Sequence, residues 1–525
     1  MREPRAILVS LLLLWPAPTV AQGSADLGPQ VDKIFARFSG ADRPGCAIGI
    51  ARDAKTVYAH GYGMANLEYD VPNSEATIFE SGSVAKQFTA AAIVLLGQQG
   101  KLSLDDDARK YVPEIPRFAG QTITVRHLLN HTSGLRDQWG LLDIEGLGPG
   151  TQVHSPATTL DLVAHQKSLN FPAGSEYLYS NTGYVLLGVI VQRTSGQTLA
   201  QFTTEQLFRP LGMTHTQWRD DFTRVVKGRA TAYAPAANGL FKLDMPFTNM
   251  IGNGGLLTTV GDLLLWNENL DAPKVGGRAF VDAMETRGRL TDGRTIDYAL
   301  GLTVSSYRGV AEVSHGGSTA GYRTFLARYP AQHVSIAVLC NAAGANPTAG
   351  AHQAADLVLG TLASEPVPTA PAGMASTAAE LDRIAGVYRN ARSGEVMRIE
   401  SRNGRLVSPQ RPGLPFVLIG PGHVNAGAAD LVIEGPPGAR TLRVTTRASG
   451  TEVFTEMPRE VGGAALGEYA GTYASDELDA RLVIERRGES LVLKRRPSVE
   501  LTLVAAYRDG FEAPSLGSLQ FTRNA

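Results

Sequence analysis

Ser83 and Lys86, three residues apart in Ser83-Val-Ala-Lys86, are the first residues whose types and spacing suggest chemistry. They follow the extended segment 76–80 and open an apolar helical run over 87–96. Side chains three apart share a helix face, and the first turn places Ser83 near the positive end of the helix dipole. Burial can lower a lysine pKa until the amine accepts a hydroxyl proton. The pair predicts a serine nucleophile with an amine base, although so short a motif also occurs by chance.

A second group, Tyr179-Ser180-Asn181, lies in a loop just before the helical run that begins at Tyr184. A tyrosine beside a cationic lysine can lose its proton or relay one. An asparagine amide can hydrogen-bond a substrate carbonyl. The alternative is structural, a buried tyrosine with a capping asparagine, because a similar pattern recurs at Tyr388-Arg-Asn390.

A third group, His315-Gly316-Gly317-Ser318, ends the strand-like run 310–314. Paired glycines let another backbone, such as that of a substrate, approach closely. The backbone N–H of Ser318 and that of Ser83 are candidates for an oxyanion hole. The alternative is a turn at the end of a strand with an incidental histidine.

Together and in this order, the three groups resemble the motifs of the penicillin-recognising serine hydrolases, which include β-lactamases, D-amino-acid peptidases and related esterases. The resemblance extends over residues 30–362 and includes supporting segments at 100–105, 123–135, 210–213 and 254–262. It implies an α+β fold, in which a five-stranded antiparallel sheet is flanked by helices and the site lies between the sheet and a helical lobe.

The same resemblance implies a role for each residue of the three groups. Ser83 is expected to be the acylated nucleophile, Lys86 its base partner and Tyr179 a second proton relay. Asn181, His315, Gly317 and Ser318 are expected to bind substrate. No metal or cofactor is predicted, because no metal-ligand spacing is present in the sequence.

The third motif departs from the pattern of typical β-lactamases and carboxypeptidases, which have lysine where this chain has His315. A histidine is mostly neutral at pH 7, so recognition of a substrate carboxylate should be weak. His-Gly-Gly followed by β modules resembles the D-stereospecific aminopeptidases, whose C-terminal domains close over the site. An aminopeptidase must hold a substrate ammonium group. The candidates are the acidic segment 475–479 and Glu512, and the alternative for both is a solvated turn.

The elements that position these groups come from both ends of one region. Residues 46–68 read as a hairpin, 76–290 as mostly helical, and the runs between 298 and 340 as strands before a closing helix over 351–362. One mixed sheet built from both ends, with a helical lobe inserted between them, is the economical interpretation. The predicted hydrolase domain spans residues 26–362.

The remainder of the chain predicts two small all-β, barrel-like modules. A Pro- and Ala-rich linker over 363–378 precedes them. Ile384-Ala-Gly-Val-Tyr388 recurs as Tyr469-Ala-Gly-Thr-Tyr473, 85 residues later, which indicates related modules at 379–460 and 465–525. The second module is short, so both a complete and an incomplete barrel stay open.

The N-terminus has the pattern of a secretory signal peptide over residues 1–21. Arg2 and Arg5 precede an apolar run over 6–15, and small residues end at Ala21. The run is too short to span a bilayer, so a periplasmic or secreted protein is expected. Two buried free thiols are the favoured state of Cys46 and Cys340, and a disulfide is the alternative.

The composition excludes several other classes of protein. The 525 residues are 43% hydrophobic and 19% charged, which is ordinary globular composition. A net charge of -1 gives no reason to expect a nucleic acid partner. The sequence therefore predicts an exported serine acyl hydrolase for short D-residue peptides or amides, including peptidoglycan fragments. A carboxylesterase or β-lactamase using the same site, and a catalytically idle wall-binding sensor, are the alternatives.

Overall fold

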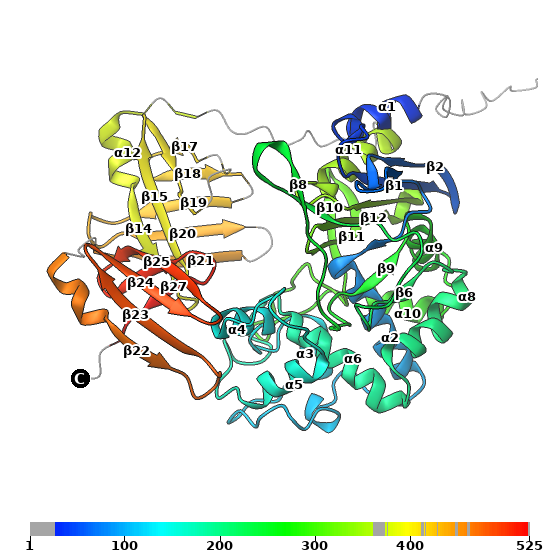
Figure 1. Cartoon of the computed structure of the whole chain (residues 1–525), viewed down its shortest axis with the longest axis horizontal. Helices are drawn as coiled ribbons and strands as arrows, with labels where there is room; N and C mark the ends of the chain where they lie inside the picture. The colour runs from blue at the N-terminus through cyan, green and yellow to red at the C-terminus, as the bar shows by residue number, and fades with distance from the viewer. Residues whose placement is uncertain are drawn as a thin grey trace, which may run out of the picture.

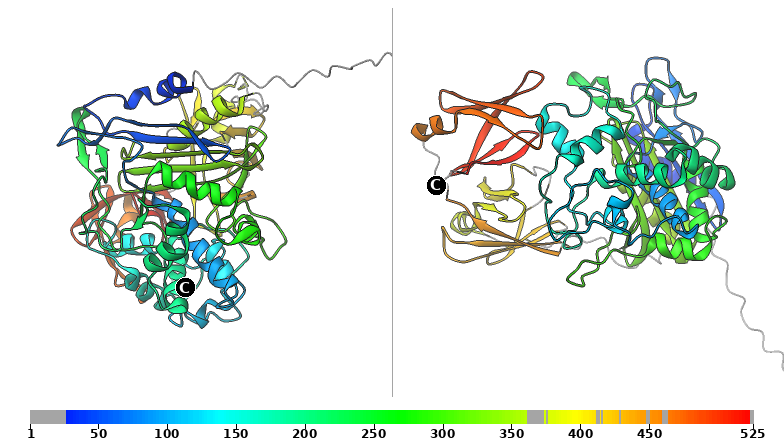
Figure 2. Two further views of the ribbon diagram at one scale, coloured as in Figure 1. Left: turned by 90° about the vertical axis from the view of Figure 1, so that its right-hand side faces the viewer. Right: turned by 90° about the horizontal axis from the view of Figure 1, so that it is seen from below.

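The computed structural model describes residues 27–360, 373–374, 376–410, 414, 416–427, 429–446, 450–458 and 463–522. Figure 1 shows a large N-terminal domain with two β modules beside it, and Figure 2 shows the same arrangement from two other sides. The predicted signal peptide over 1–21 lies outside the described residues, as does most of the predicted linker. No helix within the described ranges is long and apolar enough to cross a membrane.

A six-stranded sheet is the centre of the N-terminal domain, with the order β10-β11-β12-β13-β1-β2. Every neighbouring pair in it is antiparallel, so the prediction of a mixed sheet is wrong and the prediction of an antiparallel one is confirmed. There are six strands and not five, because β10 adds an edge beside β11. The strands are β1 (Cys46–Arg52), β2 (Lys55–Tyr62), β10 (Thr303–Tyr307), β11 (Val310–Thr319), β12 (Tyr322–Tyr329) and β13 (Val334–Cys340).

Helices cover both faces of this sheet, which explains why its central strands are continuous apolar runs. Every residue of β13 is buried, as are all residues of β1 except the last. On one face α11 packs over β12 and β13, with α1 against α11 and β2, and on the other face α9 packs over β1 and β13. These helices are α1 (Leu27–Phe35), α9 (Val260–Asp271) and α11 (Pro347–Leu359).

The helical lobe is built around α2 and α6, which pack against each other inside the largest apolar cluster. Residues 87–96 of α2 are buried, so this helix forms the core of the lobe. The lobe helices are α2 (Lys86–Gln98), α3 (Val125–Leu129), α4 (Gln138–Glu145), α5 (Pro156–Ala164), α6 (Asn181–Ser195), α7 (Leu199–Thr203), α8 (Arg209–Leu211) and α10 (Gly277–Glu285). Short strands accompany them: β3 (Met64–Asn66), β4 (Val71–Pro72), β5 (Phe79–Glu80), β6 (Gln217–Trp218), β7 (Tyr233–Pro235), β8 (Phe241–Leu243) and β9 (Leu256–Thr258).

The first C-terminal module is a nearly closed eight-stranded sheet, β16-β15-β14-β21-β20-β19-β18-β17, whose end strands approach at the bridge between Leu406 and Phe416. The second is a six-stranded sheet in sequence order, β22 to β27, that curves as a half-barrel. The first contains α12 (Ala378–Ile384), β14 (Gly386–Arg389), β15 (Val396–Arg402), β16 (Arg405–Val407), β17 (Val417–Gly420), β18 (His423–Ala426), β19 (Ala429–Glu434), β20 (Thr441–Thr446) and β21 (Gly450–Glu456). The second contains β22 (Gly471–Ala474), β23 (Arg481–Arg487), β24 (Ser490–Arg495), β25 (Val499–Tyr507), β26 (Gly510–Ala513) and β27 (Gly517–Gln520).

The sequence echo between the modules has a structural counterpart. The Tyr388 hydroxyl donates to the Ile384 carbonyl at 2.8 Å, and the Tyr473 hydroxyl donates to the Tyr469 carbonyl at 3.0 Å. In both modules a helical turn thus leads into the first strand through a tyrosine that bonds four residues back. The repeated Tyr is therefore a corner that fixes how each sheet begins.

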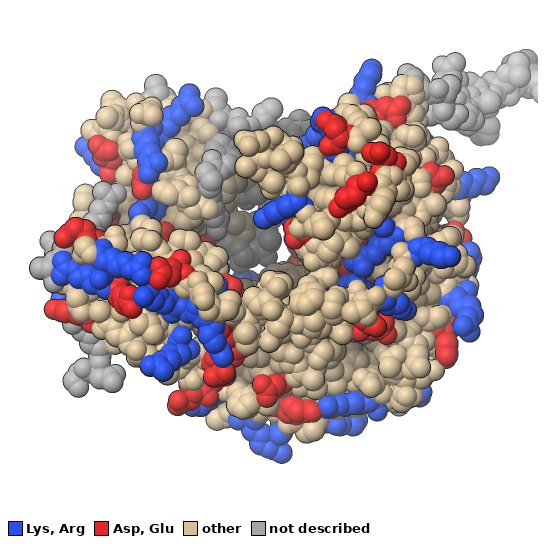
Figure 3. Space-filling view, in the orientation of Figure 1, with Lys and Arg blue, Asp and Glu red and all other residues tan. Residues whose placement is uncertain are grey.

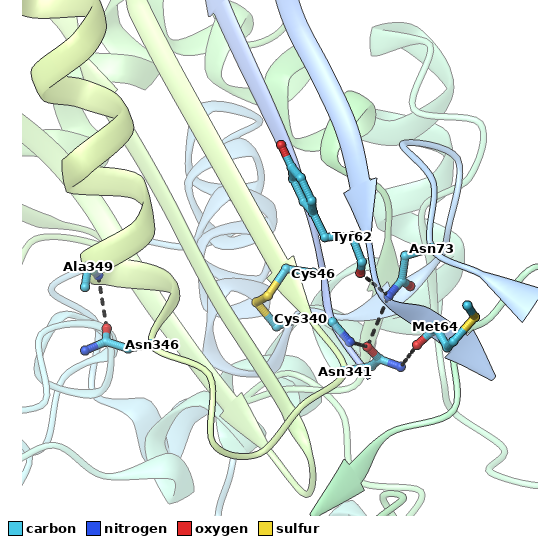
Figure 4. Close-up of a disulfide and its surroundings, with 9 residues drawn as sticks. Cys46, Tyr62, Met64, Asn73, Cys340, Asn341, Asn346 and Ala349 are labelled. Atoms are coloured by element: carbon cyan, nitrogen blue, oxygen red, sulfur yellow. Dashed lines mark hydrogen bonds between the residues drawn. A yellow bond between two sulfur atoms is a disulfide. The ribbon is translucent and has the colours of Figure 1, made fainter. Parts of the chain in front are cut away.

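Cys46 and Cys340 form a disulfide, so the prediction of two free thiols is wrong. The two cysteines lie directly opposite each other on the neighbouring strands β1 and β13, although 294 residues separate them in sequence. Figure 4 shows the disulfide beside Asn341, whose amide donates to the Met64 carbonyl at 2.9 Å. The cross-link therefore joins the first strand of the domain to its last.

Replacing both cysteines by alanine should lower the free energy of unfolding by about 2–4 kcal/mol, because the disulfide closes a long loop in the unfolded chain. Urea unfolding of the Cys46→Ala/Cys340→Ala protein measures this loss. The wild-type protein under reducing conditions is the control, and it should move to the same midpoint. Equal midpoints for the oxidised, reduced and double-variant proteins would contradict the expectation.

Candidate active site

Ser83 lies in the short 3₁₀ helix η2 (Gly82–Ala85), directly before α2. Strand β5 leads into it and is held by pairing with β9, which fixes the chain just before Ser83. The Lys86 amine donates a hydrogen bond to the Ser83 hydroxyl at 3.0 Å. The helix-face argument from the sequence thus agrees with the observed placement of the two side chains.

The Lys86 side chain is fully buried, and its amine has three acceptors. Besides Ser83 these are the Asn181 side-chain oxygen at 2.9 Å and the Asn253 carbonyl at 2.7 Å. Burial lowers the pKa of Lys86 to about 7, and the negative charge of Asp137 opposes that change. At neutral pH a large fraction of the protein therefore holds an uncharged amine that can accept the proton of Ser83.

Asn181 and Asp137 hold this amine from the side of the helical lobe. Asn181 is the first residue of α6. The helix therefore begins three residues before Tyr184, where the sequence pattern predicts its start. Its side-chain amide donates to the Asp137 carboxylate at 3.0 Å, and its backbone N–H donates to the same oxygen at 2.5 Å. The bonds of Asn181 are thus directed to Lys86 and Asp137, while its predicted contact with a substrate carbonyl stays a prediction.

Tyr179 lies over the same amine, with its ring centroid 4.7 Å from the Lys86 nitrogen. Burial raises the pKa of Tyr179, and the nearby Ser83 hydroxyl opposes the rise. Within the described residues its hydroxyl makes no well-formed hydrogen bond. Since the environment lowers the pKa of the lysine and raises that of the tyrosine, Lys86 is suited to accept a proton and Tyr179 to donate one.

His315 is buried behind Tyr179, with the two ring centroids 6.4 Å apart. The Tyr298 hydroxyl lies 2.9 Å from its Nε2 atom, and its Nδ1 atom lies 2.6 Å from the Gly316 carbonyl oxygen. Burial, followed by the charge of Lys86, lowers the pKa of His315 to about 4. The imidazole is therefore neutral at pH 7, and its Nε2 atom faces Tyr298. A neutral ring cannot form an ion pair with a substrate carboxylate.

The glycines of the third motif allow two backbone segments to lie close together. The motif lies inside β11, which continues to Thr319, and not in a turn at the end of the strand. A Cβ atom on Gly317 would lie 2.0 Å from the Ser81 carbonyl oxygen, and one on Gly82 would lie 2.6 Å from the Ser318 nitrogen. The strand and the nucleophile turn can therefore meet only where side chains are absent. This contact brings Ser318 beside Ser83, as an oxyanion hole requires.

A cavity of about 390 Å³ opens above these groups. Ser83, Tyr179, Asn181 and Ser318 line it, whereas His315 and Gly317 do not. Apolar side chains form much of the wall: Trp139, Pro149, Met245, Pro246, Phe247 and Met250. Figure 3 shows a hollow between the N-terminal domain and the C-terminal modules.

Arg219 is the cationic side chain that lines this cavity within the described residues. It forms a buried two-pronged ion pair with Glu80, at 2.8 and 2.9 Å, and also donates to the Thr248 carbonyl. The guanidinium group therefore bonds to other groups of the protein and is not available to a substrate. With His315 neutral, the lining residues that the structure describes offer no available cation for a substrate carboxylate.

The two acidic segments that the sequence offered for a substrate ammonium group both lie away from the cavity lining. Glu477 pairs with Arg136 and accepts from the Lys167 backbone N–H at 3.2 Å. Asp476 pairs with the Lys167 amine at 3.2 Å. Glu512 accepts from the Gln410 amide at 2.5 Å, a contact between the two β modules. Both segments contact another part of the molecule, while the Asp476 and Asp479 side chains remain exposed to solvent.

The segment 475–479 docks the second module onto α4. Leu478 packs with Leu141 and Leu142 in an apolar cluster that also includes Trp139, a wall residue of the cavity. Nearby, Arg495 of β24 pairs with the Asp143 carboxylate at 3.0 Å. The second module is therefore attached to the helix whose N-cap is Asp137.

Asp137, the Glu80–Arg219 pair and Asp244, which also lines the cavity, are site residues that the sequence did not reveal. Asp137 follows the supporting segment 123–135, and its position before a helix is typical of an N-cap. Nothing in the sequence connects it with Asn181, which is 44 residues away. The pairing of Glu80 with Arg219 spans 139 residues and has no local signal.

Comparison with known proteins places the chain in a family. Residues 31–361 match the family model described as Beta-lactamase, so the chain belongs to the β-lactamase family and is a serine hydrolase. A D-aminopeptidase of Cereibacter sphaeroides is 27% identical over 454 residues, which are 85% of this chain and 82% of that protein. Penicillin-binding protein 4* of Bacillus subtilis is 30% identical over 307 residues, 55% of this chain and 66% of that one.

The fold of the whole chain also has a counterpart among solved structures. The octameric penicillin-binding protein homologue from Pyrococcus abyssi has a TM-score of 0.60 and 24% sequence identity. The match covers 90% of this chain and 99% of that chain, so it includes the C-terminal sheets. The predicted fold, a β-lactamase-like α+β domain followed by barrel-like β modules, is confirmed.

The pH dependence of hydrolysis should report the buried Lys86 amine. With the neutral amine assigned as the base, kcat/KM is expected to rise with pH through an apparent pKa of about 7. Asp137→Asn removes the charge that raises this pKa, so the midpoint should move to lower pH even where the maximal rate falls. Exposed Asp161→Asn is the matched control and should leave the midpoint in place. A midpoint unaffected by Asp137→Asn would contradict the assignment.

Proposed function

We propose that the protein is an exported serine acyl hydrolase that cleaves short D-residue-containing peptides or amides, in the manner of a D-aminopeptidase. The observation that carries the proposal is the hydrogen bond from the buried Lys86 amine to the Ser83 hydroxyl, at 3.0 Å, beneath a cavity whose described lining has no available cation. The similarity to a D-aminopeptidase over 85% of the chain supports the same substrate class.

The proposed reaction begins when neutral Lys86 takes the Ser83 proton and the serine oxygen attacks the substrate carbonyl. The C–N bond breaks, and the proton passes through the Tyr179 hydroxyl to the leaving amine. Water then attacks the acyl-enzyme, gives one proton to the base, and Ser83 leaves with that proton. The site ends in its starting protonation state.

The negative charge on the carbonyl oxygen needs fixed donors during both attacks. We assign this role to the backbone N–H groups of Ser83 and Ser318, because the close contact at Gly82 and Gly317 brings their segments together. The donors belong to different parts of the domain, the nucleophile turn and the sheet. Their mutual position is therefore held by the whole β11–η2 contact.

The electrostatics of the cavity favour an amide with a free amine over a penicillin. Penicillins and C-terminal peptide substrates carry a carboxylate, which the neutral His315 and the committed Arg219 leave without a partner. A neutral ester meets no such penalty, so carboxylesterase activity is the second candidate function. β-Lactamase activity ranks below both, because the carboxylate of a penicillin would find no partner at His315 or Arg219.

Export is proposed from the signal-peptide pattern over residues 1–21. The disulfide between Cys46 and Cys340 supports it, because such bonds persist in oxidising compartments such as the periplasm. Peptidoglycan fragments, which contain D-residues, would meet the enzyme there. The mature protein recovered from the periplasm or medium should lack residues 1–21 by intact mass, and retention of these residues in all fractions would contradict export.

The decisive experiment is intact-mass analysis after incubation with D-alanine amide, a short-chain ester or a penicillin. We expect a covalent acyl adduct and product release, fastest for the amide or the ester. Ser83→Ala should abolish the adduct and reduce turnover to background, because the attacking oxygen is gone. Ser306→Ala, on an exposed edge strand, is the control and should keep both. Turnover that survives Ser83→Ala would overturn the mechanism.

A further inference from the structure

The cavity around Ser83 contains one charge that the protein leaves uncompensated. Three ionisable side chains that ordinarily carry a charge at pH 7 line it within the described residues: Glu80, Arg219 and Asp244. Glu80 and Arg219 neutralise each other as a buried pair. The Asp244 carboxylate has neither a hydrogen bond nor an ion pair with any part of the protein that the structure describes. The cavity therefore presents a net negative charge at Asp244.

The backbone holds Asp244 firmly in place. This residue follows β8 directly, and its N–H donates to the Ala232 carbonyl at 2.9 Å. Its own carbonyl accepts from the Gly321 N–H at 2.8 Å. Gly321 lies in the turn between β11 and β12, so Asp244 is tied to the strand that contains Ser318. An anion held at a fixed position relative to the nucleophile loses little entropy when it binds a cation.

Apolar side chains stand beside this carboxylate. Met245 and Phe247 follow it in the chain, are more than a third exposed, and line the same cavity. The Phe247 ring packs edge-on against Phe222 at 4.7 Å, which steadies it. Trp139 faces the cavity from α4. The site thus combines a nucleophile, an anion and an apolar wall, which together match an α-amino acid amide with an apolar side chain.

We propose that Asp244 binds the α-ammonium group of the substrate and that the Met245–Phe247 wall receives its side chain. The inference rests on the proposed hydrolysis of amides and adds the group that selects for a free amine. It assigns this role within the N-terminal domain, since the acidic segment of the second module is paired with Arg136 and Lys167. Substrates blocked at the amine should lose this contact.

The test compares Asp244→Asn with wild type on D-alanine amide, which carries the ammonium group, and p-nitrophenyl acetate, which does not. The ratio of kcat/KM for the amide to that for the ester should fall by at least about tenfold, through KM, because a charge-assisted bond is lost. Asp221→Asn, on the loop that contains Phe222, is the control and should keep the wild-type ratio. An unchanged ratio in Asp244→Asn, with or without a parallel loss of both activities, would overturn the proposal.

A second measurement keeps the test independent of amide turnover. If the wild type hydrolyses only the ester, D-alanine amide should still inhibit ester hydrolysis, and Asp244→Asn should weaken that inhibition by the same factor. N-acetyl-D-alanine amide, which is neutral, should inhibit both proteins equally. Equal inhibition of both proteins by D-alanine amide would reject the ammonium site, whereas absent amide turnover alone would reject the proposed peptidase function.

Discussion

The burial of the Lys86 amine is the constraint on which the rest of the site depends. An amine removed from water needs a partner for each proton while it is charged, and it needs a reason to lose one. Ser83, Asn181 and Asn253 supply the three acceptors from three different segments of the chain. The lobe, the nucleophile turn and the loop before β9 must therefore pack together before the amine is a usable base.

The same constraint extends outward to the C-terminal modules through α4. Asp137 caps the start of this helix and holds Asn181, while the other end contacts Arg495 and the chain around it. Gly146, just after α4, approaches the Arg496 carbonyl so closely that a Cβ atom there would lie 2.0 Å from it. One short helix thus connects the base, the cavity wall at Trp139 and the second module. The β modules are structurally continuous with the site.

Most features that depend on residues close together in the chain can be predicted from the sequence. The Ser83–Lys86 face and the paired modules follow from spacing and repetition, and the structure agrees with both. The antiparallel sheet follows from the family resemblance, whereas the apolar runs by themselves predict a mixed sheet. The failures involve residues whose partners are far along the chain. Cys46 meets Cys340 only through strand register. Similarly, the acidic segment 475–479 reads as a solvated turn or a substrate contact, and only tertiary packing shows that it is a docking contact on α4.

The charge pattern of the cavity is determined by residues outside the Ser83, Lys86 and Tyr179 group. A cation in the third motif would favour a carboxylate, but here burial keeps His315 neutral and Tyr298 fixes its ring. The guanidinium group of Arg219 is paired with the Glu80 carboxylate. With neither group available as a cation, the unpaired Asp244 carboxylate gives the cavity a negative charge among the lining residues that the structure describes. Because these pairings do not involve Ser83, Lys86 or Tyr179, the charge of the cavity and the placement of these three side chains depend on separate groups of residues.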